Sequence, residues 1–227
     1  MIMDGNGRWA ELRGLPRIEG HRQGVSVVRE MVEACVEQGI SYLSLFAFSH
    51  ENWSRPPEEV HFLMELFVLA LQKELPALIE KKIRLCFLGA RTGLTEHLIA
   101  QMQNAEEATR DNPVLQLNIA LNYTGKWDIL NAIQQCLKEK IDVTSLDMVT
   151  FEKFLSTDGI PEPDLMIRTS GEKRISNFFL WQIAYTELYF TDVLWPDFNK
   201  NLLLDAIQFY ANRERRFGQT SQQLRDK

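Results

Sequence analysis

The chain has 227 residues, of which 45% are hydrophobic and 25% charged, and this balance is typical of a soluble globular protein. Its formal net charge of −6 argues against nucleic-acid binding through a broad basic surface, so an anionic ligand would have to be held by a local cluster of arginines. No apolar run reaches the ~18 residues that cross a bilayer, and the three cysteines lack metal-binding spacing, so we expect a cytoplasmic protein with free thiols.

Apolar segments of strand type alternate along the chain with longer amphipathic segments. The expected strands are residues 1–3, 41–49, 83–88, 115–121, 165–167 and 188–190. The expected helices are residues 24–38, 57–81, 93–110, 127–140 and 202–216. This alternation predicts a single α/β domain over residues 1–227, with a central, mostly parallel sheet of about six strands flanked by helices.

Polar residues follow several of these strands directly. Asp4 and a glycine-rich stretch come after the first strand, residues 49–55 after the second and Arg168 after the strand at 165–167. Ligands of open parallel sheets bind beyond the carboxyl ends of the strands. We therefore expect these polar side chains to meet at one edge of the sheet.

Arginines are placed where they could bind an anion. Arg8, Arg55 and Arg168 each lie just past a strand, and Arg174 follows a few residues later. Arginine binds phosphate through paired, charge-assisted hydrogen bonds. Each one alone is more simply explained as a surface salt bridge, but together with the glycines they favour an anion site.

The stretch from Gly5 to Ala10 also matches the G-x-G-x-x-A dinucleotide fingerprint, which is weak evidence when it stands alone. The adjacent Asp4 counts against a dinucleotide, because that fold places the pyrophosphate on backbone amides without a metal. Residues 13–16 would also interrupt the helix that should follow.

Two carboxylates and one histidine are further candidates. Asp4 and Glu187 could bind Mg²⁺, which takes one or two carboxylates together with water and substrate phosphate oxygens. Glu187 could equally be a charge at a strand edge. His21, just before the expected helix, could donate to a phosphate or carry a proton, and a capping or solvent-exposed role is equally open.

Three long stretches are distinctive: MDGNGRWA at 3–10, FSHENWSRP at 48–56 and DLMIRTSGEKRISNFFLWQIAYTELYFTDVLWPDF at 164–198. Together with the Gly20–His21 pair, they resemble the cis-prenyltransferase family, and within it the bacterial undecaprenyl diphosphate synthases. The resemblance runs in order from residue 1 to about residue 218.

The resemblance implies an enzyme that condenses isopentenyl diphosphate repeatedly onto farnesyl diphosphate with cis stereochemistry and Mg²⁺. The product would be undecaprenyl diphosphate, a lipid-carrier precursor for cell-wall synthesis. It implies a homodimer with a hydrophobic tunnel for a product that partitions to the membrane, and a protein that is at most peripherally associated with it. The net charge of −6 indicates no nucleic-acid partner.

The resemblance also implies residue roles. Asp4 matches the essential aspartate that helps to bind Mg²⁺, and Asn52 the residue proposed to take part in proton removal. Glu187 matches a second Mg²⁺ ligand that can come from the partner subunit. The residues matching substrate-binding positions are Gly5, Asn6, Gly7, Arg8, Trp9, Arg17, His21, Ser49, His50, Glu51, Trp53, Arg55, Arg168, Arg174, Ile175 and Ser176.

Departures from the family pattern are few. Lys173 replaces a common histidine, Thr124 and Lys126 replace a glycine and an arginine, and His50 replaces a common serine. None of them alters Asp4 or the arginines. Non-catalytic relatives of the same fold lack that aspartate and several of the arginines, so a purely structural partner subunit is the weaker alternative.

The segment 57–81 carries apolar residues at helical spacing, and two interpretations of them are open. They could be ordinary core residues packed on the sheet, or some could line the tunnel that the family resemblance implies. The residues concerned are Phe62, Leu63, Leu66, Phe67, Ala70 and Leu71.

Overall fold

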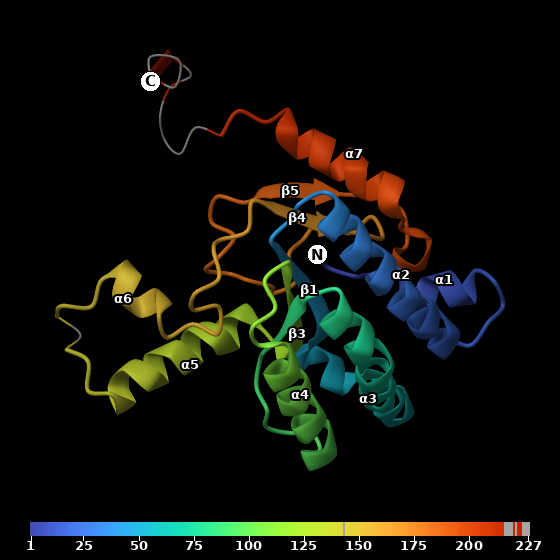
Figure 1. Cartoon of the computed structure of the whole chain (residues 1–227), viewed down its shortest axis with the longest axis horizontal. Helices are drawn as coiled ribbons and strands as arrows, with labels where there is room; N and C mark the ends of the chain where they lie inside the picture. Colours follow the sequence, from blue (N-terminus) through green and yellow to red (C-terminus); the bar gives the residue numbers. More distant parts are fainter. Residues whose placement is uncertain (143, 216–219, 221, 224–227) are drawn as a thin grey trace.

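A computed structural model of the chain describes residues 1–142, 144–215, 220 and 222–223 (Figure 1). Helices and strands alternate along it as the sequence predicts. The strands are β1 (Tyr42–Ser49), β2 (Ile83–Leu88), β3 (Leu115–Tyr123), β4 (Leu165–Arg168) and β5 (Glu187–Phe190). The α-helices are α1 (Asn6–Glu11), α2 (Arg17–Glu37), α3 (Pro57–Glu80), α4 (Glu96–Thr109), α5 (Gly125–Lys138), α6 (Met148–Glu152) and α7 (Lys200–Ala211), and the 3₁₀ helices are η1 (His50–Ser54) and η2 (Trp195–Asp197).

The sheet is parallel throughout its described pairs. β3 lies between β1 and β2, and β4 pairs with β5. Ile2 forms parallel bridges to Phe46 of β1 and to Arg168 of β4, so it joins the two parts. The expected first strand is therefore reduced to a single bridging residue, and the parallel α/β architecture is confirmed with five strands among the described residues.

The start of α2 differs from the sequence prediction. Apolar residues at helical spacing predict a helix over residues 24–38, but α2 begins at Arg17, directly after Pro16. Gly20 lies inside this helix at a point where α1 approaches it closely. A Cβ on Gly20 would lie 1.9 Å from the carbonyl oxygen of Asn6, so only glycine allows α1 to pack there.

Apolar side chains cover both faces of the sheet. The largest buried cluster joins the strands to α2, α3, α4 and α7, with Trp195 and Phe198 at its edge. A second cluster on the other face holds Tyr123, Phe178 and Phe179. The ring of Tyr123 meets both phenylalanines edge to face, at 6.1 and 5.5 Å. The sheet is thus packed on both sides, as a parallel sheet requires.

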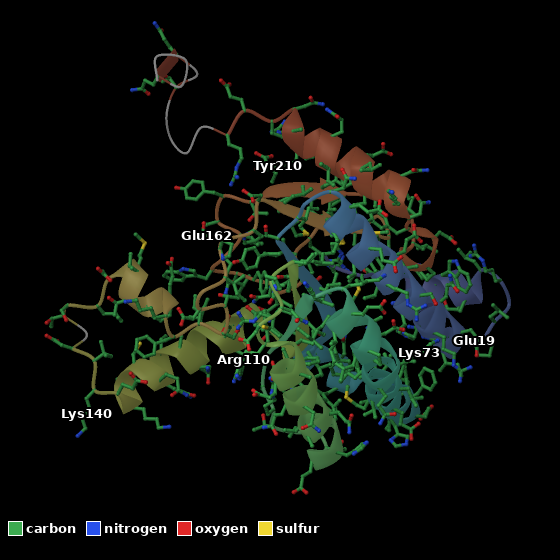
Figure 2. The ribbon with its side chains drawn as sticks, viewed as in Figure 1. Glu19, Lys73, Arg110, Lys140, Glu162 and Tyr210 are labelled. Carbon is green, nitrogen blue, oxygen red and sulfur yellow. The ribbon has the colours of Figure 1, made fainter. Side chains whose placement is uncertain are left out.

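The surface carries charged side chains as well as exposed hydrophobic residues such as Leu12 and Met148. The side chains of Lys73, Arg110, Lys140 and Glu162, labelled in Figure 2, are exposed. No helix among the described residues combines the length and the apolar character needed to cross a membrane.

Candidate active site

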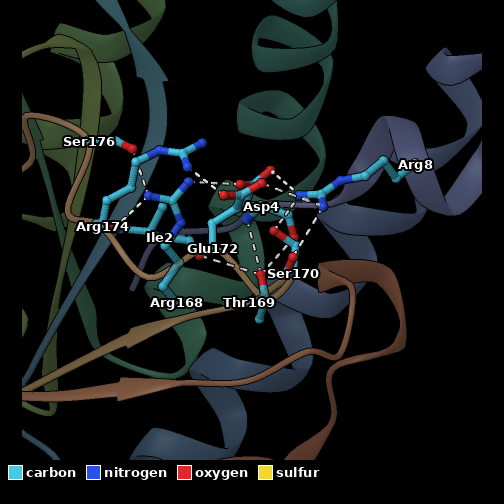
Figure 3. Close-up of polar contacts among 9 residues, drawn as sticks. All are labelled: Ile2, Asp4, Arg8, Arg168, Thr169, Ser170, Glu172, Arg174 and Ser176. Atoms are coloured by element: carbon cyan, nitrogen blue, oxygen red, sulfur yellow. Dashed lines mark hydrogen bonds and ion pairs between the residues drawn. The ribbon is translucent and has the colours of Figure 1, made fainter.

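Asp4 lies just beyond the carboxyl edge of the sheet, because Ile2 is fixed between β1 and β4. The backbone N–H of Asp4 donates to Thr169 Oγ1 at 3.0 Å, and the Thr169 hydroxyl donates back to the Asp4 carbonyl at 2.7 Å. The same carbonyl accepts from Trp195 N–H at 3.0 Å. The backbone of Asp4 is thus fixed by two segments distant in sequence, of which Figure 3 shows the one that carries Thr169.

The Asp4 carboxylate is held between two arginines. Arg168 Nη2 donates to Asp4 Oδ2 at 2.9 Å, and Arg8 Nη2 lies 3.5 Å from Asp4 Oδ1. Burial by itself would raise the pKa of Asp4. The hydrogen bonds from Arg168 and Ser170 and the charges of Arg168 and Arg8 outweigh burial, so the pKa lies below its ordinary value. Asp4 is therefore ionised at neutral pH.

Arg168 is the buried member of this group, with 4% of its side chain exposed. Besides Asp4, its guanidinium donates to Ser176 Oγ at 2.6 Å and to the carbonyl of Arg174. Ser176 has a positive φ of 48° and belongs to the loop after β4. Arg168 therefore fixes both the carboxylate and the loop on which Arg174 and Ser176 lie.

Arg8 is more accessible than Arg168, with 43% of its side chain exposed. Its Nη2 donates to Ser170 Oγ at 2.6 Å and its Nη1 to the Ser170 carbonyl at 3.1 Å. Glu172 lies 3.8 Å away and also pairs with Arg174. These contacts orient Arg8 while leaving part of its guanidinium open to a ligand.

A second cationic group surrounds Glu59 near the start of α3. Arg17 Nε donates to Glu59 at 3.3 Å and Arg55 Nη1 at 3.2 Å, while His21 Nε2 lies 3.6 Å away. Burial lowers the pKa of His21 to about 4; Arg55 and Arg17 act in the same direction and Glu59 opposes them. His21 is therefore neutral at pH 7, and its ring offers one donor and one acceptor.

The glycine of the α1 turn has a steric function here. A Cβ on Gly7 would lie within 2.5 Å of the Arg17 guanidinium. Gly7 therefore allows Arg17 to cross above α1 and reach Glu59. A larger residue here would displace the end of the Arg17 side chain, and α1 itself ends after Glu11.

The Asp4 carboxylate, His21 and the arginines described above line one cavity of about 770 Å³, which runs between α2, α3 and the sheet. Its apolar lining includes Val28, Leu45, Ile119 and several residues of α3. Of the α3 residues considered above, Leu63, Leu66, Phe67, Ala70 and Leu71 line it, whereas Phe62 packs beneath the guanidinium of Arg22. The predicted site residues that line it are Asp4, Gly5, Asn6, Gly7, Arg8, Arg17, His21, Ser49, Glu51, Asn52, Arg55, Arg168, Arg174 and Ser176.

Other predicted site residues do not line this cavity. Trp9 donates from its indole to Asp197 at 2.6 Å and lies beneath Arg13. Ile175 packs against the second apolar cluster. His50 and Trp53 lie on η1, where Trp53 contacts Phe48 edge to face at 5.3 Å. The structure thus brings together most of the predicted set, but not these four residues or Glu187.

Glu187 does not meet Asp4 within one chain. In the β4–β5 ladder Glu187 pairs with Leu165, whereas Arg168, which holds Asp4, is at the opposite end. Leu165 and Arg168 are three positions apart on β4, which corresponds to roughly 10 Å along the strand. Glu187 instead accepts from Arg213 Nε at 3.1 Å.

The described side chains of the site provide too few ligands to hold a divalent cation by themselves. In the part of the chain that the structure describes, no three His, Cys, Asp or Glu side chains are grouped to hold a metal ion. Asp4 is an ionised carboxylate next to two arginines, and Mg²⁺ typically binds one or two carboxylates together with substrate phosphates and water. These residues therefore fit Mg²⁺ that is bound together with a diphosphate.

Sequence reasoning missed several supporting residues. Thr169, Ser170 and Glu59 contact the predicted site residues directly, and Asn177 lines the cavity. Thr169 and Ser170 follow Arg168 in the strand-end segment, so their position was a usable signal. Glu59 lies on the first turn of α3, where an acidic residue is expected for helix-dipole reasons alone.

Comparison with known proteins identifies the family. Residues 2–218 match the family model described as putative undecaprenyl diphosphate synthase. This chain belongs to that prenyltransferase family. A Legionella pneumophila (strain Paris) relative, ditrans,polycis-undecaprenyl-diphosphate synthase ((2E,6E)-farnesyl-diphosphate specific), is 57% identical over 98% of this chain and 95% of its own length. An isoprenyl transferase of Chromobacterium violaceum is 53% identical over 99% of this chain and 88% of its own.

Solved structures of the family agree with the fold. Lavandulyl diphosphate synthase from Lavandula x intermedia, in complex with dimethylallyl diphosphate, superposes with a TM-score of 0.91 at 36% identity and covers 96% of both chains. A probable undecaprenyl diphosphate synthase from Campylobacter jejuni gives 0.79 at 34% identity, covering 87% of this chain and 93% of its own. Prenyltransferases with different products therefore share this architecture.

Proposed function

We propose that this chain is a cis-prenyltransferase that condenses isopentenyl diphosphate repeatedly onto farnesyl diphosphate and yields undecaprenyl diphosphate for cell-wall synthesis. The names of relatives that are 49–57% identical over nearly the whole chain support this activity. We further propose that residues 1–227 form one cis-prenyltransferase domain.

One observation carries the proposal: Asp4, paired with Arg8 and Arg168, lines the same cavity as the apolar residues of α3. Arginines that bind diphosphate lie next to space that accepts a hydrocarbon. A prenyl diphosphate has both parts, and a growing product needs both at once. We propose that the apolar part of the cavity serves as the product tunnel.

The proposed reaction develops negative charge on the pyrophosphate that leaves. The C–O bond of the allylic diphosphate breaks, and its electron pair leaves with pyrophosphate. The double bond of isopentenyl diphosphate attacks the allylic carbon, and a proton is lost from the adjacent carbon. Arg8, Arg17 and Arg55 are placed to stabilise the charge on the leaving group, and such preorganised charge is a major source of catalysis. We assign Arg168, Arg174 and Ser176 to the isopentenyl diphosphate.

Asn52 is poorly suited to remove the proton itself. A side-chain amide is a very weak base, and its Oδ1 already accepts from the backbone N–H of Ser49 at 3.0 Å, while its NH₂ group can donate to a ligand. We propose that Asn52 orients a substrate phosphate, and that this phosphate or a water accepts the proton. An Asn52→Ala variant with full turnover would exclude a direct part for Asn52.

We propose Mg²⁺ as the cofactor, held by Asp4 together with the bound diphosphate. When bound, it would supply Lewis-acid stabilisation of pyrophosphate departure. Glu187 could join this site only from a partner subunit, given its place on β5. Mixing Asp4→Ala subunits with Glu187→Ala subunits tests this, because a site shared across a homodimer would recover activity in mixed dimers.

We also propose that the protein is a cytoplasmic homodimer that associates with membranes at most peripherally and passes its product to them. The dinucleotide alternative is testable in the same preparation. Farnesyl diphosphate should raise the melting temperature and NADH should not, since a ligand that binds only the folded state stabilises it.

The direct experiment is an incubation with radiolabelled isopentenyl diphosphate, farnesyl diphosphate and Mg²⁺, with chain length read by chromatography. We expect a long cis-polyprenyl diphosphate and no elongation by Asp4→Ala. An inactive wild-type protein that still binds farnesyl diphosphate would instead support the non-catalytic partner.

A further inference from the structure

Asn122 lies near the end of β3 and is outside the set of residues assigned to the site. It is 2% exposed and has a positive φ of 53°. Asparagine adopts this left-handed conformation more readily than most residues with a side chain. The position therefore combines an unusual backbone with a buried amide, and the partners of that amide are informative.

Every hydrogen-bonding position of the Asn122 amide is used. Its Nδ2 donates to the carbonyls of Ala90 at 3.1 Å and Thr92 at 3.0 Å, while Oδ1 accepts from the Trp53 indole at 2.9 Å. His50 Nδ1 lies 3.4 Å from the same oxygen. Carbonyls only accept and an indole N–H only donates, so these partners fix the orientation of the amide.

Two of these partners belong to η1, the turn that carries cavity residues. His50 and Trp53 do not line the cavity, whereas Glu51 and Asn52 of the same turn do. Asn122 thus contacts η1 through the two residues that do not line the cavity. On its other side, Glu51 accepts from Asn177 at 2.9 Å, so η1 is held between two asparagines.

We propose that Asn122 is a positioning residue of the condensation reaction: through Trp53 it holds η1 so that Glu51 and Asn52 face the substrates. The proposal rests on the proposed function. It also gives Trp53 a role that does not require contact with substrate, since its indole N–H is bonded to Asn122 and its ring packs on Phe48.

Two substitutions break this link from opposite sides. Asn122→Gly removes the amide and suits the positive φ, so it adds no backbone strain. Trp53→Phe keeps an aromatic ring against Phe48 and removes the indole donor. Asn118→Ala is the matched control, because Asn118 is a fully buried amide on the same strand that bonds Ser44 and Gln116 and does not touch η1.

We expect Asn122→Gly and Trp53→Phe each to lower kcat at least tenfold, and the double variant to lose little more than Asn122→Gly alone. Amide hydrogen exchange of residues 50–54 should rise at least tenfold in both single variants and stay unchanged in Asn118→Ala. Amide hydrogen exchange of η1 does not depend on the identity of the substrate. An inactive wild-type protein would therefore overturn the proposed function, but it would not bear on whether Asn122 anchors η1.

Wild-type exchange at residues 50–54 and wild-type kcat in Asn122→Gly would overturn the proposal. So would an equal loss of kcat in Asn118→Ala, which would indicate general destabilisation. If Asn122→Gly does not fold, Trp53→Phe decides alone: unchanged exchange and kcat in that variant reject the inference, and a rise in exchange with a fall in kcat supports it.

Discussion

The carboxylate of Asp4 and the guanidinium of Arg168 lie 2.9 Å apart although 164 positions separate them in the sequence. Ile2 makes this possible, since its bridge to Arg168 aligns the N-terminal segment with β4. The pair is asymmetric, because Arg168 is buried and Asp4 is one-third exposed. We therefore expect substitution of Arg168 to affect mainly stability, and substitution of Asp4 to affect mainly catalysis.

Asp4→Asn should lower kcat by about three orders of magnitude, comparable to the loss of a key electrostatic group in other enzymes. The fold should persist, because the asparagine oxygen can still accept from Arg168. Steady-state kinetics and calorimetry measure the two effects. Glu107→Gln is the control, since it breaks an exposed carboxylate–arginine pair on α4 and should leave kcat unchanged. Normal elongation by Asp4→Asn would refute its proposed role.

Arg168→Ala and Arg8→Ala should differ in stability. Removing Arg168 leaves Asp4 without its closest partner and loosens the loop at Ser176, so we expect a loss of about 3–5 kcal/mol. Arg8 is 43% exposed, and its removal should cost less than about 1 kcal/mol while raising the KM for the diphosphate substrate. Urea unfolding and kinetics measure both effects, and equal destabilisation by the two variants would contradict this ranking.

His21 should make the stability of the protein depend on pH. Its pKa in the folded chain is about 4, below the ordinary 6.5, so between these values the unfolded chain binds a proton that the folded chain does not. The free energy of unfolding should therefore fall as the pH is lowered from 7 to 5, by up to about 2 kcal/mol.

Comparison of two histidine variants isolates this contribution. His21→Gln should flatten the pH dependence of the unfolding free energy in this range. His61→Gln should not, because 76% of the His61 side chain is exposed on α3. Chemical unfolding at several pH values provides the measurement, and identical slopes for His21→Gln and wild type would count against the buried, neutral histidine.

Ala70→Phe should shorten the product. Ala70 lines the apolar part of the cavity, so a larger side chain would occupy space that we assign to the growing chain. Stability should change little, since the ring enters existing space. Leu69→Phe is the matched control, because Leu69 precedes it on α3 and is 61% exposed. Chromatography of the products measures their chain length. An unchanged chain length in Ala70→Phe would indicate that the growing chain does not occupy the cavity beside Ala70.

Alternating apolar and amphipathic segments predicted the strands to within a few residues, because strands buried on both faces read as continuous apolar runs. Helix starts were less accurate. The expected start at residue 93 is replaced by Glu96, where Thr95 caps the helix by accepting from Leu98 N–H. The last helix was expected to reach residue 216, which lies outside the described residues; α7 itself ends at Ala211.

The proximity of Asp4 and Arg168 was predictable, because both residues follow or end strands of a parallel sheet. The candidate site was not predictable where function depends on packing between elements. The sequence does not reveal that Trp53 binds Asn122, or that Glu59 gathers Arg17 and Arg55. Such contacts depend on the distance between α2, α3 and the sheet, which no local pattern specifies.

The bridge at Ile2 has a consequence for assembly of the molecule. Hydrogen bonds from Ile2 N–H to Ile167 and from Phe46 N–H to Met1 are the seam between the two groups of strands. Asp4 lies two residues beyond that seam. The hydrogen bonds that complete the sheet are therefore also the ones that bring the N-terminal segment, and with it Asp4, next to Arg168.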